Sequence, residues 1–137
     1  MYNISNMDKS EDIILETRND LVNFLKTTPY DYVILKFHAD WCAPCNHIGP
    51  KVRAIADETA KKYAEHENKF IFIEVDVDEC FDLYAFLKSK KMVRGIPTLF
   101  FYSKKVYSVM EENHIFITQT SVSGTKENEI KQLFSLI

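Results

Sequence analysis

Positions 41–45 carry the sequence Trp-Cys-Ala-Pro-Cys, and this stretch decides how the rest of the chain is interpreted. It follows a hydrophobic run at 32–37 and precedes a segment with helical periodicity, so Cys42 and Cys45 are predicted where a strand gives way to a helix. Unpaired backbone N–H groups and the positive end of the helix dipole favour thiolate over thiol at such a position. Two cysteines at this spacing can also form a disulfide with each other, which predicts a pair that cycles between dithiol and disulfide.

The composition indicates a single globular domain. The chain has 137 residues, of which 46% are hydrophobic and 13% aromatic, enough to bury a core without disulfide support. We expect residues 1–11 to form a flexible N-terminal extension and residues 12–137 to form one domain. A net charge of −3 argues against a nucleic-acid partner. No apolar run approaches the ~18–20 residues that a membrane span needs, so no membrane partner is expected.

The cysteine content bears on both compartment and chemistry. Only three cysteines occur, which is too few for a disulfide framework, and residues 1–10 lack the apolar segment of a secretory signal. We therefore expect a cytoplasmic protein, in which a Cys-x-x-Cys pair indicates redox or metal chemistry. Cys80 and a histidine could complete four metal ligands with the pair. Because the chain has no second Cys-x-x-Cys and no closely spaced His pair, we predict no metal site.

The order of predicted elements indicates an α/β fold. Hydrophobic periodicity predicts a central mixed sheet of about five strands flanked by four helices, with a parallel core and a closing antiparallel hairpin. The hairpin is expected to turn near residues 111–113, and Asp78 is expected to cap the helix that contains Cys80. The predicted strands span 12–16, 32–39, 70–77, 98–102 and 115–122, and the predicted helices cover 17–26, a long segment from residue 42, the segment around Cys80 and a last segment after Gly124.

From about residue 12 to residue 137 the sequence resembles the thioredoxin family. The resemblance rests on the motif at 39–45, on Pro50 five residues after the second cysteine, and on Gly-Ile-Pro-Thr at 95–98, which is similar to the family's cis-proline loop. The run at 72–80 is similar to the corresponding run of animal-type thioredoxins. This resemblance implies the thioredoxin fold.

The resemblance also implies an activity, the reduction of protein disulfides by a thioredoxin-type electron carrier. Cys42 would be the nucleophile that attacks a substrate disulfide, and Cys45 would resolve the mixed disulfide. Pro97, if cis as in the family, would place the backbone of Ile96 beside Cys42 to pair with the incoming chain.

Two further residues complete the groove that the resemblance implies. Trp41 would form its apolar wall, and Pro44 would stiffen the turn between the cysteines. The implied partners are proteins that contain disulfides and a thioredoxin reductase, a flavoprotein that draws electrons from NADPH. The protein itself is expected to be a monomer without a bound cofactor, because the Cys42–Cys45 disulfide would carry the electrons.

Lys36 departs from the family pattern, because the family usually has a buried Asp behind the resolving cysteine. Glu74 aligns roughly where bacterial members carry the Lys that partners this Asp. One interpretation is an ion pair of reversed polarity that leaves the carboxylate as proton acceptor. A buried Lys36 with a lowered pKa could instead be the base itself. A third interpretation is that Lys36 extends to the surface and touches nothing.

Three other features leave alternatives open. The segment Ser103–His114 lengthens the closing hairpin, and it could dock a partner or be a tolerated insertion. Cys80 could be a regulatory thiol or an ordinary packing residue. The basic tract at 88–91, together with Arg94, could steer acidic partners or form a solvated loop.

Two rival functions remain open beside disulfide reduction. The chain could be a thioredoxin-fold binding or adaptor module whose cysteines act as a trap or are not turned over. It could also be an oxidant or isomerase, although such proteins usually have His between the cysteines. A reduction potential above about −200 mV would contradict the reductase interpretation.

Overall fold

The protein is built around a four-stranded sheet. The computed structural model describes residues 13–137, so the predicted extension at 1–11 lies outside the described residues. The strand order is β2-β1-β3-β4, in which β1 runs parallel to β2 and antiparallel to β3, and β4 is antiparallel to β3. The strands are β1 Tyr32–His38, β2 Phe70–Asp76, β3 Thr98–Ser103 and β4 Thr120–Ser123.

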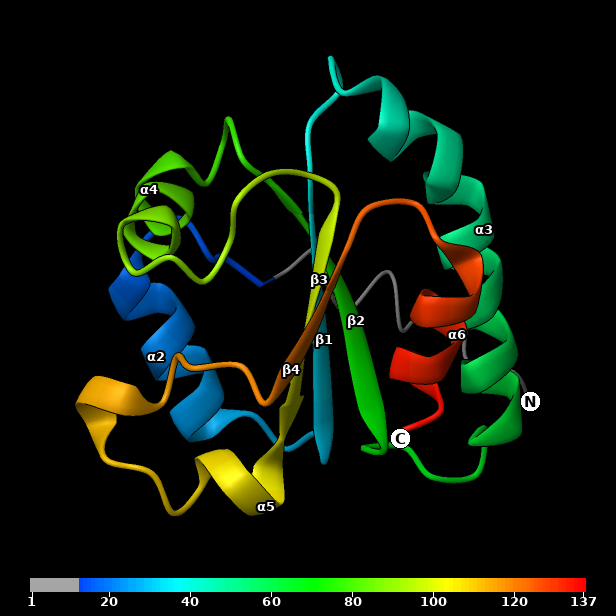
Figure 1. Ribbon diagram of the computed structural model, residues 1–137. Coiled ribbons are helices and arrows are strands. Elements are labelled where there is room, and N and C mark those ends of the chain that lie inside the picture. The colour runs from blue at the N-terminus through cyan, green and yellow to red at the C-terminus, as the bar shows by residue number, and fades with distance from the viewer. Residues whose placement is uncertain (1–12) are drawn as a thin grey trace.

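Helices cover both faces of this sheet (Figure 1). On one face lie α2, Arg18–Thr27, and α4, Phe81–Ser89. On the other face lie α3, Ala43–Lys62, and α6, Glu127–Phe134. The four-residue helix α5, Lys104–Tyr107, follows β3. No helix within residues 13–137 is both long and apolar enough to cross a membrane.

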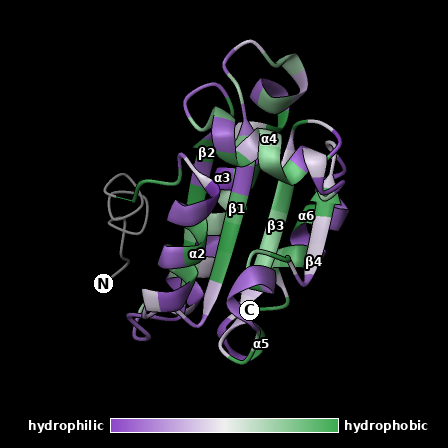
Figure 2. Ribbon diagram, turned by 90° about the vertical axis from the view of Figure 1, so that its left-hand side faces the viewer, coloured by the Kyte–Doolittle hydropathy of each residue, from purple (hydrophilic) through white to green (hydrophobic). Residues whose placement is uncertain are grey.

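The side chains of β1 alternate between two hydrophobic clusters, one on each face of the sheet. Val33, Leu35 and Phe37 belong to the cluster on the α2 and α4 face, whereas Ile34 belongs to the cluster on the α3 and α6 face. Because successive strand side chains point to opposite faces, Lys36 shares the α3 face with Ile34. Figure 2 shows that the middle strands are mainly hydrophobic in colour, whereas α2 and α4 mix the two colours. The sheet therefore places a lysine inside the layer that α3 covers.

The predicted α/β architecture of the thioredoxin type is confirmed, but within residues 13–137 the sheet has four strands where about five were predicted. The predicted first strand at 12–16 is wrong for its described residues, since 13–16 form no helix or strand, and residue 12 lies outside the described part of the chain. Leu15 is buried, and the backbone N–H of Leu83 donates to the carbonyl of Glu16 over 3.0 Å. The segment therefore packs against the first turn of α4 and does not pair with a strand.

The predicted antiparallel pairing of the last two strands is confirmed, since β4 pairs with β3, but the predicted bounds of the last strand, 115–122, are wrong. Residues 104–119 form α5, a 3₁₀ turn at Glu112–His114 and irregular chain, and only Thr120–Ser123 pairs as a strand. Buried aromatic residues hold this connection against the body of the protein. The Tyr107 hydroxyl donates to the carbonyl of Tyr30 over 3.1 Å, and the Tyr102 hydroxyl donates to the carbonyl of Phe116. Tyr107, Ile115 and Phe116 thus anchor the connection in the core on the α2 side, whereas most of its other residues are exposed.

The prediction that Asp78 caps the helix containing Cys80 is wrong as well. The N-cap residue of α4 is Cys80, and its side chain makes no capping hydrogen bond. The Asp78 carboxylate instead accepts a hydrogen bond from the Trp41 indole, with 2.8 Å between the two atoms. The Asp78 carboxylate therefore binds Trp41, next to the disulfide, and does not cap α4.

Candidate functional site

The two cysteines of the motif lie at the start of α3. Cys42 is the N-cap residue with an extended backbone, and its sulfur accepts a hydrogen bond from the backbone N–H of Cys45 over 3.2 Å. Pro44 follows in the first turn, where a residue without an N–H costs the helix nothing. The two cysteines are joined by a disulfide, and their Cα atoms lie 5.3 Å apart. Both are buried, Cys42 being 5% exposed and Cys45 3%.

A loop from the far end of the chain lies against this disulfide. The peptide bond between Ile96 and Pro97 is cis, and the Cys42 sulfur lies 3.8 Å from the carbonyl oxygen of Ile96. The loop is held from both sides, because the Thr98 hydroxyl donates to the carbonyl of Gly95 and the Gly124 N–H donates to the carbonyl of Pro97. A fixed backbone edge is thus present beside the first sulfur.

Trp41 forms the exposed border of the same site. Its side chain is 69% exposed, which is unusual for a residue of this size. The hydrogen bond to Asp78 fixes the indole in place, although most of its surface stays in water. An exposed, immobilised aromatic ring beside a disulfide is suited to contact an incoming polypeptide.

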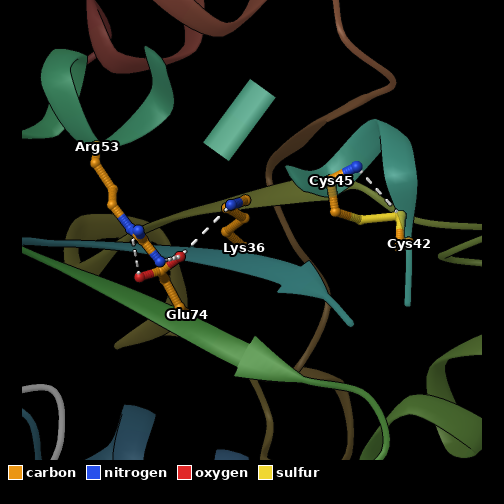
Figure 3. Close-up of polar contacts among 5 residues, drawn as sticks. All are labelled: Lys36, Cys42, Cys45, Arg53 and Glu74. Carbon is orange, nitrogen blue, oxygen red and sulfur yellow. Dashed lines mark hydrogen bonds and ion pairs between the residues drawn. A yellow bond between two sulfur atoms is a disulfide. The ribbon is translucent and has the colours of Figure 1, made fainter. Parts of the chain in front are cut away.

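Lys36 is buried and paired behind the disulfide. It is 2% exposed, and its ammonium lies 3.5 Å from the Glu74 carboxylate, across the register of β1 and β2. The interpretation in which this lysine extends to the surface and touches nothing is therefore wrong. Figure 3 shows Lys36 between Glu74 and the disulfide, on the side of the sheet that α3 covers.

Sequence reasoning missed Arg53, which binds the same carboxylate. Its Nε and Nη2 atoms each lie 3.1 Å from an oxygen of Glu74, a two-pronged contact (Figure 3). Cys45, Gly49 and Arg53 recur at four-residue steps and therefore share one stripe of α3. A Cβ atom added at Gly49 would lie 3.4 Å from the Lys36 ammonium, so the missing side chain leaves room for it. This stripe was the available signal for Arg53.

The three charged groups affect one another's ionisation. Burial lowers the pKa of Lys36, and the neighbouring Glu74 charge opposes this effect only in part. Burial alone would raise the pKa of Glu74, but the Arg53 hydrogen bond and the Lys36 charge outweigh it, so the pKa is lowered overall. Glu74 is therefore held as a carboxylate, while the uncharged form of Lys36 is favoured relative to a lysine in water.

Cys80 lies in a different electrostatic environment. It is a free, half-buried thiol, and burial together with the charges of Glu79, Glu16, Asp76 and Asp20 raises its pKa to about 11. At neutral pH it is a protonated thiol, which is a poor nucleophile. Among residues 13–137, no group of three or more His, Cys, Asp or Glu side chains is placed to hold a metal ion.

Comparisons with known sequences give a consistent result. The family model described as Thioredoxin matches residues 13–129. Thioredoxin from Oryctolagus cuniculus is 32% identical over 90 residues, which cover 66% of this chain and 74% of that protein. Thioredoxin-2 from Saccharomyces cerevisiae is 34% identical over 94 residues, 67% of this chain and 79% of that protein. The chloroplastic thioredoxin-like protein CITRX from Oryza sativa is 34% identical over 71 residues, but the chain spans only 32% of its length.

Solved structures share the fold. A structure of thioredoxin from Plasmodium falciparum matches with a TM-score of 0.58 and 24% identity, and the match covers 88% of this chain and 94% of that one. Oxidised mitochondrial thioredoxin 3 from Saccharomyces cerevisiae matches with a TM-score of 0.60 and 19% identity, covering 90% and 92% of the two chains. At these identities the likeness establishes the arrangement of helices and strands.

Proposed function

The chain belongs to the thioredoxin family, and on that premise we propose that it is a thiol–disulfide oxidoreductase that reduces protein disulfides. One observation carries the proposal: the Cys42–Cys45 disulfide at the start of α3 lies beside the backbone of the cis Ile96–Pro97 bond. A redox-active pair thus has, within one site, a helix N-terminus to favour the thiolate and a free backbone edge to orient a polypeptide.

The reaction starts from the reduced dithiol. The Cys42 thiolate attacks one sulfur of a substrate disulfide, a new S–S bond joins Cys42 to the substrate, and the other substrate sulfur leaves as a thiolate that takes up a proton. The backbone of Ile96 pairs with the substrate chain, as a short added strand does. Trp41 forms the apolar wall of the groove, and Pro44 stiffens the turn between the cysteines.

Cys45 completes the cycle as the resolving thiol. It loses its proton and attacks the Cys42 sulfur, which reforms the disulfide of the protein and releases the second substrate thiol. Lys36 is the proposed proton acceptor, because it lies between Glu74 and the disulfide and burial lowers its pKa. Glu74 is the weaker candidate, since Arg53 and Lys36 both stabilise its carboxylate. Glu74 and Arg53 act as positioning residues for the lysine.

The proposed source of electrons is a thioredoxin reductase, a flavoprotein that draws on NADPH. The protein needs no cofactor of its own in this scheme, because the two sulfurs carry the electron pair. We propose that it acts as a monomer on proteins that contain disulfides, in a reducing compartment such as the cytoplasm. The free Cys80 is compatible with such a compartment.

Turnover of insulin disulfides with NADPH and a thioredoxin reductase tests this function. The wild type should turn over, Cys42→Ser should be inactive, and Cys80→Ser should match the wild type. A parallel reaction with dithiothreitol as electron donor removes the dependence on the chosen reductase. Inactivity of the wild type with both donors would contradict the reductase and favour the binding module.

The role of Lys36 needs a separate comparison. Lys36→Met removes the proposed proton acceptor but leaves the Arg53–Glu74 pair in place, so the variant should fold and turn over more slowly. Single-turnover kinetics would locate the loss in the release of the mixed disulfide, with the first attack by Cys42 unchanged. Equal release rates in the variant and the wild type between pH 6 and pH 9 would rule out the relay without affecting the reductase.

A further inference from the structure

A cleft that none of the steps above uses lies on the opposite face of the sheet from α3. It has a volume of about 910 Å³ and lies between α2, the end of α4 and the connection at 104–119. In Figure 1 the orange part of this connection lies on the same side of the sheet as α2 and α4. The volume falls within the range of about 300–1,000 Å³ that is typical of ligand sites. Neither the disulfide nor the cis-proline loop lines it.

The floor of the cleft is apolar. Val22 of α2 and Phe116 of the connection are each 8% exposed. Phe86 of α4 packs edge to face against Phe116, with their ring centroids 4.9 Å apart. Ile117, 39% exposed, adds an apolar side chain at the border. The floor can therefore take up an apolar side chain of a ligand.

Two cations border this floor. The Arg18 guanidinium lies 4.7 Å from the centroid of the Phe86 ring, and the Lys90 ammonium lies 5.8 Å from the same centroid. Neither forms an ion pair with a carboxylate of the part of the chain that the structure describes. The lining carboxylate of Glu112 lies 3.3 Å from the Lys26 ammonium, which offsets its charge. The cleft therefore presents positive charge to a ligand.

The end of α4 forms one side of the cleft. Lys91 has a φ of 59°, a left-handed conformation that glycine adopts at far lower cost than a lysine. The Met92 N–H donates to the carbonyl of Leu87 over 3.0 Å, which closes the helix at this residue. The residues on either side of Lys91 both line the cleft. The end of α4 thus holds Lys90 and Met92 in the wall of the cleft.

We propose that this cleft binds an acidic peptide segment of a partner protein. Carboxylates of the peptide would pair with Arg18 and Lys90, and an adjacent apolar side chain would rest on Phe116 and Ile117. The positive charge continues beyond the cleft through the exposed basic tract at 88–91. The positively charged surface is therefore longer than one small anion can cover, and it complements an extended peptide with several carboxylates. The site acts independently of the thiol chemistry.

Fluorescence anisotropy with a defined probe tests the site. The probe is a fluorescein-labelled dodecapeptide that alternates Glu with Leu and contains one Trp, and a second peptide has Lys in place of each Glu. The acidic peptide should bind the wild type, and the basic peptide should not. Arg18→Glu combined with Lys90→Glu should weaken binding by about tenfold or more, because two attractive pairs become repulsive. Ile117→Ser should weaken binding several-fold, and 500 mM NaCl should weaken it as well.

A matched control separates a specific site from net charge. Lys62→Glu combined with Lys105→Glu makes the same change in charge at two exposed lysines that do not line the cleft. This variant should bind within twofold of the wild type. The proposal would be overturned if both double variants lost affinity for the acidic peptide equally, or if the wild type did not bind this peptide at millimolar protein. Displacement of the peptide by an equal concentration of phenylacetate would overturn it too, because the cleft would then be a small-molecule site.

The same variants separate this site from the proposed reductase. Arg18→Glu with Lys90→Glu should reduce insulin at the wild-type rate, and Cys42→Ser should bind the acidic peptide with the wild-type affinity. Loss of peptide binding in Cys42→Ser would place the peptide in the substrate groove and overturn the proposal.

Discussion

Cys42 and Cys80 both lie at the start of a helix, but they differ in their hydrogen bonds and in the charges around them. Cys42 and Cys80 are the N-cap residues of α3 and α4, and each follows a strand of the parallel pair β1 and β2. The sulfur of Cys42 accepts a backbone hydrogen bond from the first turn of its helix, whereas the side chain of Cys80 makes no capping hydrogen bond. A helix N-terminus acts on a thiol only when the sulfur points at the free N–H groups.

The charges around the two helices also differ. The first turn of α3 has no acidic residue, and the side chains of Lys36 and Arg53 both contact the Glu74 carboxylate on the face of the sheet that α3 covers. Burial of Cys80, together with carboxylates on three neighbouring segments, raises its pKa to about 11. Position at a helix start therefore does not by itself make a cysteine reactive; the orientation of the sulfur and the local charge decide.

The largest expected difference concerns turnover. Cys42→Ser should lower the rate of insulin reduction by at least about a thousandfold, because the nucleophile is lost. Cys80→Ser should stay within twofold of the wild type, since the thiol is protonated and takes no part in the exchange. The measurement is NADPH consumption in the presence of a thioredoxin reductase. A loss of more than tenfold in Cys80→Ser would remove the distinction between the two cysteines.

The next difference is the alkylation rate of Cys80 as a function of pH. With a pKa of about 11 the thiolate fraction should rise about tenfold per pH unit up to that pH. At pH 7 the folded protein should react several hundredfold more slowly than the same thiol in urea, where the pKa is about 8.5. Iodoacetamide labelling of Cys42→Ser/Cys45→Ser, followed by mass spectrometry, isolates this thiol. A rate that reaches a plateau below pH 9 would contradict the carboxylate environment.

Substitutions at the buried ion pair of Lys36 and Glu74 should change the free energy of unfolding more than the rate of turnover. Glu74→Gln leaves the buried Lys36 without its carboxylate and should lower the free energy of unfolding by about 3 kcal/mol. Lys36→Met keeps the pair of Glu74 with Arg53, so it should leave stability unchanged or raise it. Urea unfolding of the three proteins checks both expectations. Equal losses in the two variants would show that the lysine is not the costly buried charge.

The pH dependence of this effect has a definite sign. The pKa of Glu74 is lowered from its ordinary value of 4.5, so its contribution to stability is fully present above pH 4.5. That contribution is lost as the pH falls through the lowered pKa of the folded state. The gap between the wild type and Glu74→Gln should therefore close below pH 4.5, which thermal unfolding in a pH series would detect. A gap of constant size from pH 7 to pH 3 would contradict the lowered pKa.

The smallest expected effect is that of a single carboxylate near Cys80. Among the charges that raise the pKa of this thiol, Glu79 has the largest effect, although burial matters more. Glu79→Gln should lower the pKa by a fraction of a unit and speed alkylation at pH 8 by about two- to fourfold. Asp57→Asn, far along α3, is the matched control for charge and should leave the rate unchanged. No change in Glu79→Gln would assign the raised pKa to burial alone.

The parts of the fold that the sequence predicts well are those in which local pattern and burial agree. The strands at 32–39 and 70–77 are continuous hydrophobic runs, as expected for a parallel pair covered on both faces, and the observed strands differ from them by one residue. The start of α3 follows from its cysteine-proline motif, whose residues favour a first helical turn.

The connection at 104–119 was mispredicted because Ile115 and its neighbours are apolar enough for a strand. Ile115 and Phe116 are instead buried on the α2 and α4 face of the sheet, through contacts between residues distant in the sequence, such as that of Phe116 with Phe86. Arg53 was missed for a similar reason, since its partner lies 21 residues away on β2. Local periodicity does not report which distant segment will supply the opposite charge or the covering surface.

Trapping the mixed disulfide between this protein and its substrate would show directly whether Cys42 is the nucleophile. Reduced Cys45→Ser cannot resolve a mixed disulfide, so it should accumulate one when mixed with insulin. Digestion under non-reducing conditions and mass spectrometry then identify the linked peptide. Insulin should be attached to Cys42, and Cys80 should stay free. Attachment to Cys80, or no adduct at all, would contradict this role of Cys42.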